Sequence, residues 1–570
     1  MLWRQTYDPF GSPVFSTLVA LLPLAVLLGL MAGRGWPAWR AAVAGLLTAL
    51  GVAVAGWGMP ADAALAAAAY GAAFGLFPIG WIIVTAMFLY SLAVEAGALD
   101  VMKRSVTRLS ADHRVQGLLI AFSFGAFLEG AAGFGAPVAI SAALLVGAGF
   151  PAFEAACLAL IANTAPVAFG ALGTPIVTLA RVTGLDEHAI SALAGRQLPW
   201  FSLIVPAWMV VATAGWSGLA GVVPAVLTCG VSFAVVQAAM ANLVGAALVA
   251  VAAGMPVMVR DMVAAFMRLW QPRSCWRYDA AGRLRPVAAD LPAEVTADPL
   301  DPPRRVAWAW TPWCLLSVVI FIWGLPAVKA TLEGKPGGPA LVAAGVAVPQ
   351  LAVPRLDGRV AKVPPASHAN EELEPAIYRL NWLSAAGTGI LVAALASIPW
   401  LGISWRRAAV IWVENLRRLS GSLVTIAAML ALAFVTRYSG TDVTLGLALT
   451  HTGPAYPLFA ALLGWLGVAL TGSDTSSNAM FGSLQRVTAE QLGLDPLLMC
   501  TANSTGGVMG KMIDAQSIVV SATATGLERA EGPILRRVLP HSLALAILVG
   551  LVVWLQAGPL AWMVPVSPAR

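Results

Sequence analysis

Long apolar runs, separated by short polar stretches, fill the chain from residue 14 almost to its end. About 20 apolar residues are enough for an α-helix to cross a hydrocarbon core of about 30 Å. The runs recur too often for a single anchor or a cleaved signal sequence. The sequence therefore predicts an all-α polytopic membrane protein with about 12–14 transmembrane helices. The expected spans, several of them long enough to be broken or doubled, are 14–33, 38–57, 70–96, 115–147, 153–180, 198–216, 220–254, 307–326, 380–400, 408–436, 454–471, 478–520 and 541–565.

The composition supports a membrane protein. Of the 570 residues, 59% are hydrophobic and 11% are charged, whereas an ordinary soluble domain has about 25% charged residues. The net charge is +6. In a membrane protein the excess Lys and Arg collects in cytoplasmic loops, so this charge indicates orientation and does not indicate nucleic-acid binding.

The positions of the basic residues predict the topology. Placing all the basic clusters in the cytoplasm gives an external N-terminus. The clusters lie at 34–40, 103–114, 260–305, 406–418 and 529–537. The chain then divides into an N-terminal membrane half (1–254), a cytoplasmic loop (255–306) and a C-terminal membrane half (307–570), in which 327–379 is an external surface loop.

Cysteine and histidine spacing excludes the common cofactor sites. The five cysteines are scattered without a metal-binding spacing, and all except Cys275 lie in apolar segments, so we expect free buried thiols and no cofactor. The five histidines form no HExxH pattern, and no GxSxG is present. An enzyme is therefore not expected.

The two halves carry similar segments. "ANTAPVAFG" (162–170) and "ANSTGGVMG" (502–510) both begin Ala-Asn and reach a glycine eight positions later. Many transporters consist of two repeats with interrupted helices at corresponding places. The pattern favours an internal duplication with broken helices or re-entrant hairpins; the alternative is chance similarity between small-residue packing segments.

The segment "GAFLEGAAGFGAP" (125–137) places Glu129 in an otherwise uncharged region. A mid-membrane carboxylate costs about 3 kcal/mol, and each glycine costs a helix about 1 kcal/mol, so a plain lipid-facing helix would not carry both. Pro137 suits the first turn of a new helix. We therefore expect a non-helical, anion-binding break at Gly130, Gly133 and Gly135, beside a titratable Glu129. The alternative is a glycine-lined packing face with a permanently protonated or hydrogen-bonded Glu129.

The segment "ALTGSDTSSNAMFGSLQ" (469–485) also predicts a helix break beside a carboxylate, with other residues. It concentrates residue types that cap helix N-termini: Ser473, Asp474, Thr475, Ser476, Ser477 and Asn478. A helix is expected to end near residue 471 and another to begin near 477. The hydroxyls would suit a small hydroxylated anion, and Asp474 is a second candidate proton carrier; ordinary capping of an interfacial turn is the alternative.

The segment "TANSTGGVMGKMIDAQS" (501–517) brings Lys511 and Asp514 into an apolar region. It is not a phosphate-binding loop, because Thr505 and Met512 stand where that motif needs glycine and a hydroxyl. Lys511 could be the counter-charge of a carboxylate substrate or half of a structural ion pair. The residues alone leave both readings open.

These motifs resemble the bacterial L-lactate permease family, which includes the glycolate permeases. The resemblance rests on "GAFLEGAAGFGAPVAI", "NTAPVAFGALGTPI", "GRQLP", "LTGSDTSSNAMFGSLQ" and "ANSTGGVMGKM" in this order. It implies a multi-pass bacterial inner-membrane symporter that takes up L-lactate, D-lactate or glycolate with a proton and performs no chemical conversion. It also implies two inverted repeats whose hairpin tips, 129–137 and 472–478, meet.

Two positions depart from the family pattern. After "GKMI" the family usually has Ser-Pro, whereas this chain has Asp514-Ala515. Arg437 stands where a neutral residue is commoner. The extra acid and the extra base are hypothesised to compensate for each other.

The expected partners are a small 2-hydroxymonocarboxylate, protons and the lipid bilayer; a homo-oligomer is left open. Helix N-termini and hydroxyls at 130–137 and 473–478 would hold the substrate carboxylate, and Glu129 or Asp474 would take up the proton. Residues from the paired segments would assist: Asn163, Thr164, Asn503, Ser504 and Lys511. The alternatives are a sodium-coupled or other organic-acid transporter and a passive channel.

Overall fold

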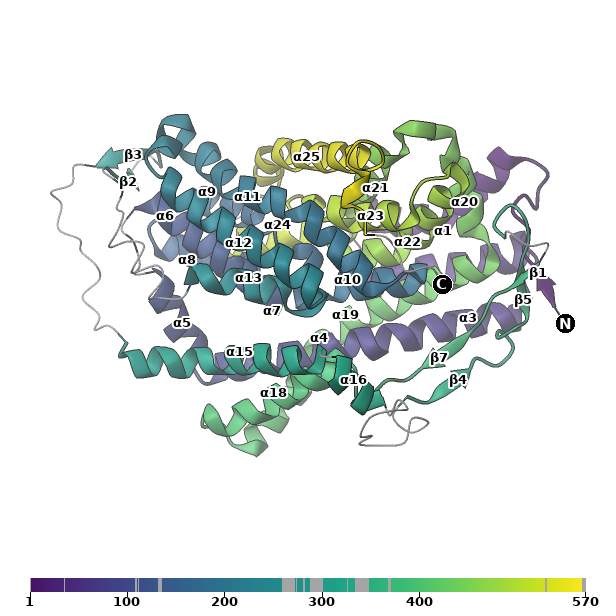
Figure 1. The fold of residues 1–570 in the computed structure, drawn as a ribbon, viewed down its shortest axis with the longest axis horizontal. Helices are drawn as coiled ribbons and strands as arrows, with labels where there is room; N and C mark the ends of the chain where they lie inside the picture. Colours follow the sequence, from purple (N-terminus) through teal and green to yellow (C-terminus); the bar gives the residue numbers. More distant parts are fainter. Residues whose placement is uncertain are drawn as a thin grey trace.

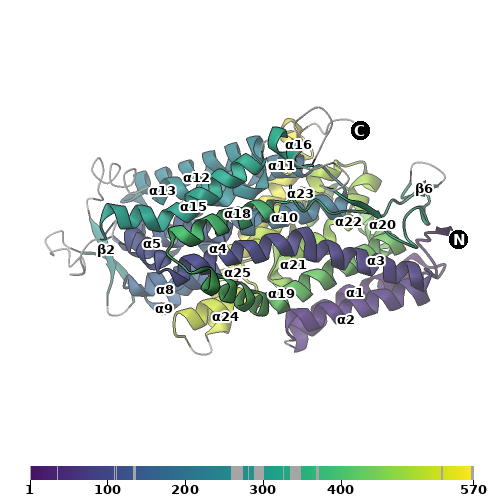
Figure 2. The same cartoon turned by 90° about the horizontal axis from the view of Figure 1, so that it is seen from below.

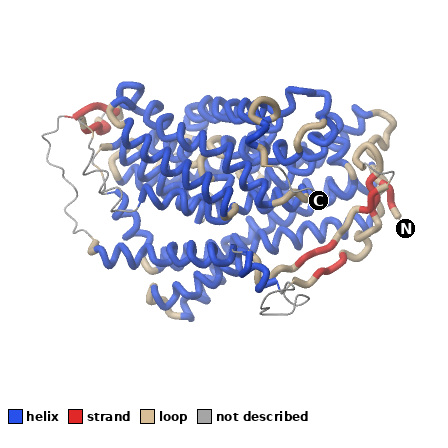
Figure 3. Tube along the Cα trace, viewed as in Figure 1, coloured by secondary structure: helices blue, strands red, loops and turns tan. Residues whose placement is uncertain are grey.

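The chain folds almost entirely into helices that run along the long axis of the molecule (Figures 1 and 3). The computed structural model describes residues 2–34, 36–107, 110, 112–131, 136–258, 272, 274–279, 282–287, 301–324, 326–333, 348–367, 371–527 and 530–565. The helices of the first half, with their short π and 3-10 turns (η), are α1 (Pro13–Arg34), α2 (Ala38–Gly51), η1 (Val52–Gly56), α3 (Ala61–Phe74), η2 (Gly75–Gly80), α4 (Trp81–Glu95), α5 (Ala98–Thr107), α6 (His113–Gly117), η3 (Leu118–Phe124), α7 (Gly125–Ala131), α8 (Ala136–Gly147), α9 (Ala152–Ala162), η4 (Val167–Phe169), α10 (Gly170–Thr183), α11 (Glu187–Ala220), α12 (Val223–Leu243), η5 (Ala246–Leu248) and α13 (Val249–Met258).

The second half is also helical and ends in one long helix. Its helices are α15 (Pro303–Gly324), α16 (Pro326–Glu333), α18 (Ala386–Trp400), α19 (Trp405–Ser439), α20 (Thr441–Leu449), η6 (Thr450–Ala455), α21 (Tyr456–Thr471), α22 (Asp474–Leu492), α23 (Pro496–Gly510), α24 (Ala515–Ala524), α25 (Glu531–Gln556) and η7 (Ala561–Met563).

Seven of the described helices are long and apolar enough to cross a membrane, or eight if α9 and α10, bent by 65° at a break, count as one span. This number is below the expected 12–14 crossings. Several apolar runs prove to be interrupted: the run 478–520 holds α22, α23 and α24, and the run 115–147 is divided between η3–α7 and α8. The all-α polytopic membrane architecture is confirmed.

The interruptions follow local capping chemistry. Gly493 ends α22 with φ of 65°, a left-handed conformation that favours glycine. Asp495 then accepts backbone hydrogen bonds at the start of α23, which has Pro496 in its first turn. These signals stop one helix and begin the next. Apolar length alone therefore overestimates the number of full crossings.

Small residues let the helices of the second half approach closely. α21 packs against α23, and α22 packs against both. A Cβ atom at Gly464 would collide with the backbone carbonyl of Asn503, and one at Gly506 would collide with Ala461. Glycine at such positions allows the backbone-to-backbone contact typical of membrane helix pairs. This contact places the first turn of α22 beside the middle of α23.

Short strands occupy the two ends of the molecule (Figures 2 and 3). At one end β1 (Trp3–Arg4) pairs in parallel with β5 (Val360–Lys362), and Trp3 lies opposite Val360. At the other end β2 (Cys275–Tyr278) pairs with β3 (Leu284–Val287). The remaining strands, all at the first end, are β4 (Gln350–Ala352), β6 (Glu372–Leu373) and β7 (Ile377–Arg379).

The strand pairings place the N-terminus and the described part of the loop 327–379 at the same end. The opposite end carries the β2–β3 hairpin from the basic segment, where Arg114 forms a buried ion pair with Asp112 at 2.6 Å. The predicted topology requires this separation, because it assigns the N-terminus and that loop to the outside and the basic segment to the cytoplasm. The sidedness itself stays a prediction.

Candidate functional site

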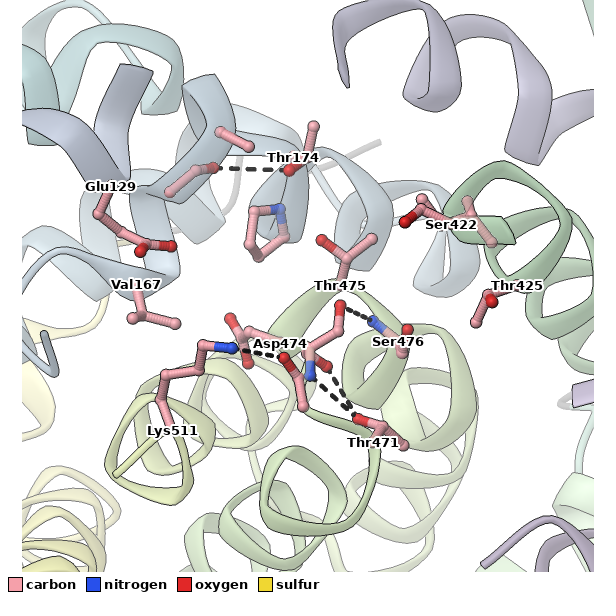
Figure 4. Close-up of a pocket in the computed structure, with 16 residues that line it drawn as sticks. Glu129, Val167, Thr174, Ser422, Thr425, Thr471, Asp474, Thr475, Ser476 and Lys511 are labelled. Atoms are coloured by element: carbon pink, nitrogen blue, oxygen red, sulfur yellow. Dashed lines mark hydrogen bonds between the residues drawn. The ribbon is translucent and has the colours of Figure 1, made fainter. Parts of the chain in front are cut away.

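A cavity of about 110 Å³ lies where the two halves meet (Figure 4). We call it the site cavity. Elements of both halves line it: Glu129 of α7, Val167 of η4, Gly170, Ala171, Thr174 and Pro175 of α10, Ser422, Thr425 and Ile426 of α19, Thr471 to Ser476 at the junction of α21 and α22, and Lys511 after α23. Its volume is well above the 10–15 Å³ or so that one water molecule requires.

Glu129 enters the cavity from the first half. Its side chain is buried, and its Oε2 atom has no hydrogen-bond partner among the described residues. Gly170 lies against it: a Cβ atom there would stand 2.7 Å from Oε1 of Glu129. Residues 132–135 are outside the described part, so Gly133 and Gly135 are not placed. α8 begins at Ala136, next to the predicted start at Pro137.

A strained turn at the start of α10 lies at the first-half wall of the cavity. Ala171, Leu172 and Gly173 have φ values of 43°, 57° and 79°, so three consecutive residues adopt a left-handed conformation. For residues other than glycine this conformation costs about 1–2 kcal/mol each. A Cβ at Gly173 would stand 2.8 Å from the Ala246 backbone of η5, so this packing holds the turn in place. Strain of this kind clusters at binding and switching sites.

The second half supplies a capped helix start, as expected from its sequence. α21 ends at Thr471, and Gly472 has φ of 71°. Ser473 then caps α22 by accepting a hydrogen bond of 3.2 Å from the Ser476 N–H. Asp474 is the first residue of α22, three positions earlier than predicted. The first N–H groups of a helix lack partners within it. Residues 473–476, at the start of α22, line the cavity.

Asp474 is held on one side only. Its Oδ2 atom accepts a 2.5 Å hydrogen bond from Ser504 and a weaker one of 3.5 Å from Asn478, both within the second half. Its Oδ1 atom has no partner in the described chain. Asn478 in turn accepts 2.9 Å from Asn503, whose side-chain oxygen accepts 3.1 Å from Gln485. A buried amide network therefore supports the carboxylate from behind.

Lys511 forms a structural ion pair and also lines the site cavity. It lines the cavity, donates 2.6 Å to the Gly472 carbonyl, and lies 3.2 Å from Oδ2 of Asp514. Both members of this ion pair are buried. Asp514 also caps α24 by accepting 2.7 Å from the Ser517 N–H. The helix start that a Ser-Pro pair would favour is thus retained by an aspartate cap.

The two departures from the family pattern do not pair with each other. Asp514 pairs with Lys511, whereas Arg437 lies 2.5 Å from Glu374 in the loop that carries β4 to β7. Arg437 also donates 3.0 Å to the carbonyl of Val182 on α10. Direct compensation between Arg437 and Asp514 is therefore wrong; each charge is matched by its own local partner.

The structure divides the predicted site residues into three groups. Those that line the site cavity are Glu129, Ser473, Asp474, Thr475, Ser476 and Lys511. Those buried behind its second-half wall are Ser477, Asn478, Asn503 and Ser504. The others described are Gly130, which packs against the backbone of α13, Thr164, whose hydroxyl donates to the Ile161 carbonyl at the end of α9, and Asn163, which is buried with both amide atoms unpartnered among the described residues.

Sequence reasoning missed two parts of the wall. Ser422 and Thr425 project from the long helix α19, and Thr425 also donates 2.8 Å to its own Gly421 carbonyl. Hydroxyls of this kind occur along many membrane helices, so they carry no local signal. The turn Ala171–Gly173 lies in the quoted segment "NTAPVAFGALGTPI", but its unusual backbone cannot be read from Ala and Leu.

The described residues contain no group of three or more His, Cys, Asp and Glu side chains that could hold a metal ion. Cys157, Cys229 and Cys500 are buried and free, as expected, whereas Cys314 is exposed on α15. The prediction for Cys314 was wrong because it equated an apolar segment with a buried one. Val318 and Ile322 are exposed on the same helix, and in a bilayer such a face meets lipid.

The comparisons with known proteins decide the family. The family model described as L-lactate permease matches residues 16–559. The chain belongs to the L-lactate permease family. It is 43% identical to an L-lactate permease of Salmonella typhimurium, over 99% of this chain and all of that protein. It is 42% identical to the glycolate permease GlcA of Escherichia coli K12, over 97% of this chain and 98% of that protein.

A solved structure of the YdaH transporter of Alcanivorax borkumensis is also similar, with 14% identity, a TM-score of 0.43 and coverage of 98% of this chain and all of that one. Family members are named as permeases, so this chain is a multi-pass membrane transporter and not an enzyme.

Proposed function

We propose that this transporter imports L-lactate, and also D-lactate and glycolate, across the bacterial inner membrane together with a proton. The observation that carries the proposal is the meeting of Glu129, Asp474 and Lys511 in one cavity between the halves. The permease relatives, named for L-lactate and glycolate, supply the substrate class. Lactate and glycolate are both monocarboxylates with a hydroxyl on the neighbouring carbon. Such an anion suits a wall of hydroxyls and helix-start N–H groups.

The substrate carboxylate would bind at the first turn of α22. The partial positive charge of a helix N-terminus and its unpaired N–H groups favour an anion. The hydroxyls of Thr475 and Ser476 stand at the same place and can bond to the 2-hydroxyl group. Lys511 adds a positive charge close by, although Asp514 already neutralises much of it. Lys511 would therefore tune the affinity, and the helix start would provide the main anchor.

Proton uptake by Glu129 or Asp474 would offset the substrate charge. A monocarboxylate brings one negative charge into a site where two carboxyl groups are already buried. Moving an uncompensated charge through a low-dielectric barrier is costly, so binding a proton with the anion lowers the barrier. Each acid has one unpartnered oxygen among the described residues, and that oxygen can hold the proton.

Alternating access would follow from motion of one half against the other. The cavity walls come from α7 and α10 on one side and from the α21–α22 junction and Lys511 on the other. Sites of this kind, between two sets of broken helices, open to either face when one set moves relative to the other. The left-handed turn of α10 is a strained element at this boundary.

Uptake of labelled L-lactate into proteoliposomes tests the proposal. We expect accumulation that requires an inward proton gradient, persists without Na⁺, and is inhibited by unlabelled glycolate and D-lactate. Accumulation that depends on Na⁺ would show that the coupling ion is sodium and not a proton. Backbone carbonyls at helix breaks also coordinate Na⁺. Equilibration without accumulation by folded protein would indicate a passive channel and would contradict symport.

A further inference from the structure

A second and much larger cavity, of about 1200 Å³, opens at the end of the molecule that carries β1. We call it the arginine-lined cavity. Its walls come from α3, α10, α11, α19, α22 and the strands of the loop 348–379. Four arginines line it: Arg181, Arg379, Arg437 and Arg486.

Two of these arginines are available to a ligand. Arg437 is paired with Glu374, and Arg486 bonds to Glu490 at 2.7 Å. Arg181 and Arg379 have exposed side chains and no ion-pair partner in the described part of the chain. The Arg181 guanidinium carbon lies 5.8 Å from the ring centre of Phe74. This contact holds the charged group in the cavity without neutralising it.

The acids in the same wall form no ion pair with Arg181 or Arg379 among the described residues. Glu490 is already bound by Arg486. Asp186 accepts a 2.8 Å hydrogen bond from the Ala189 N–H and so serves as the cap of α11. Glu187 is exposed in the first turn of that helix, where its charge favours the helix dipole. Asp186 and Glu187 keep their charges, but the N–H donors of Arg181 and Arg379 remain available to an anion.

Three helices, α10, α19 and α22, line both cavities. On α10, Thr174 lies at the site cavity and Arg181 at the arginine-lined cavity. These positions are about 10 Å apart along a helix that rises 1.5 Å per residue. On α19, Ile426 lies at the site cavity and Phe434 at the arginine-lined cavity. α22 runs from Ser476 to Arg486.

An apolar cluster separates the two cavities in this structure. Ile426 on the wall of the site cavity and Phe434 on the wall of the arginine-lined cavity belong to one buried cluster. Leu430 lies on the turn of α19 between them and is 1% exposed. Val182 of α10 and Ala479 of α22 belong to the same cluster. This cluster therefore separates an anion in the larger cavity from the site cavity.

We propose that the arginine-lined cavity is an entry chamber that binds small organic monocarboxylates at Arg181 and Arg379 before the apolar cluster opens. Arg guanidinium groups bind carboxylates through paired N–H donors. This inference rests on the proposed uptake of a monocarboxylate and adds the residues that recognise it first.

Reporter cysteines test the chamber without any transport. Ile377→Cys places a thiol on its wall, and Leu373→Cys places a matched thiol on β6 at the same end but outside it. Both are made in a background with Cys275→Ser and Cys314→Ser. For each cysteine we compare the rate of modification by an anionic methanethiosulfonate reagent with the rate for its cationic counterpart. We expect the ratio of anionic to cationic rate to be about tenfold higher at Ile377→Cys than at Leu373→Cys. Adding Arg181→Glu and Arg379→Glu should invert that preference.

Transport kinetics test the role of the same charges. Arg181→Gln should raise the KM for L-lactate about tenfold at low ionic strength and leave the maximal rate unchanged, and the effect should shrink in salt. Arg359→Gln, an exposed arginine of the same end outside the chamber, should match wild type. Equal reagent preference at the two cysteines, or an unchanged KM in Arg181→Gln, would refute the proposal. If wild type accumulates no lactate, the proposed function fails, whereas the cysteine experiment still decides whether the chamber attracts anions.

Discussion

The hydroxyl of Ser504 donates a 2.5 Å hydrogen bond to Oδ2 of Asp474, and Oδ1 of the same carboxylate has no partner among the described residues. Glu129, from the other half, lines the same cavity with one unpartnered oxygen. The two acids are therefore supported unequally. Asp474 is anchored by its own half, whereas Glu129 is held by burial.

Amide variants of the two acids should separate proton coupling from binding. We expect Glu129→Gln or Asp474→Asn, whichever removes the coupling acid, to lose proton-driven accumulation at least tenfold while lactate exchange between loaded vesicles continues. The reason is that an amide cannot carry the proton but preserves side-chain size. Counterflow and gradient-driven uptake, measured on the same vesicles, give the comparison. Accumulation by both variants at the wild-type level would show that neither acid couples.

The ion pair of Lys511 and Asp514 is expected to stabilise the fold more than it aids binding. Asp514→Asn keeps a capping side chain for α24 but leaves a buried ammonium unpaired, at a cost of about 3–5 kcal/mol. The variant should unfold at a clearly lower temperature in detergent, measured by intrinsic fluorescence.

The double variant Lys511→Met with Asp514→Asn should recover most of that stability, because no buried charge is left alone. A lower KM for lactate in Asp514→Asn would mean that the freed Lys511 binds the substrate carboxylate. An unchanged melting temperature in the single variant would show that the pair has no structural role.

Local chemistry predicted the second-half junction well. Gly472, Ser473 and Asp474 are residue types with strong preferences for helix ends, so the helix stop at Thr471 and the new start nearby follow from the sequence. Which apolar runs cross fully did not follow, because the length of a run does not show where a capped break divides it. The meeting of Glu129 with Asp474 was expected only from the family resemblance.

The turn at Ala171–Gly173 could not have been predicted from its residues. Ala and Leu avoid the left-handed conformation, and only packing of Gly173 against Ala246 explains why they adopt it. Ser422 and Thr425 were missed for a related reason. Their place at the cavity is set by where α19 lies, which depends on contacts with distant helices such as α2 and α3.

Glycine at the strained turn should stabilise the protein. Ala171→Gly removes a left-handed alanine, so we expect a gain of about 0.5–1 kcal/mol after the greater entropy of an unfolded glycine is subtracted. Ala180→Gly, in the regular part of the same helix, is the matched control and should lose about 1 kcal/mol. Thermal unfolding of the two variants gives the signs. A loss of stability in Ala171→Gly would show that the turn is not strained.

We call the ion pairs of Glu374 with Arg437 and Lys362, at the β1 end, the clasp. Its contribution to stability should depend on pH through Glu374. Burial opposes ionisation of this carboxyl, but Arg437 and Lys362 together lower its pKa below the ordinary value of 4.5. Its contribution to stability is therefore present above that value and is lost as the pH falls through the lowered pKa. Glu374→Gln should reduce the melting temperature most near neutral pH, and the difference from wild type should shrink below about pH 4.5.

The neighbouring Glu372, exposed on β6, supplies the control for this pH series. Glu372→Gln should follow the wild-type curve at every pH. A constant difference between Glu374→Gln and wild type across the series would mean that shape, and not charge, makes the clasp.

The parallel pairing of β1 with β5 has a consequence for biogenesis. Trp3 and Arg4 leave the ribosome long before their partners Val360 and Ala361. The first strand must therefore wait, unpaired, while the helices of the first half enter the bilayer. Its docking then joins the earliest segment of the chain to the strand-bearing segment of the second half, so this pairing is a late step of assembly.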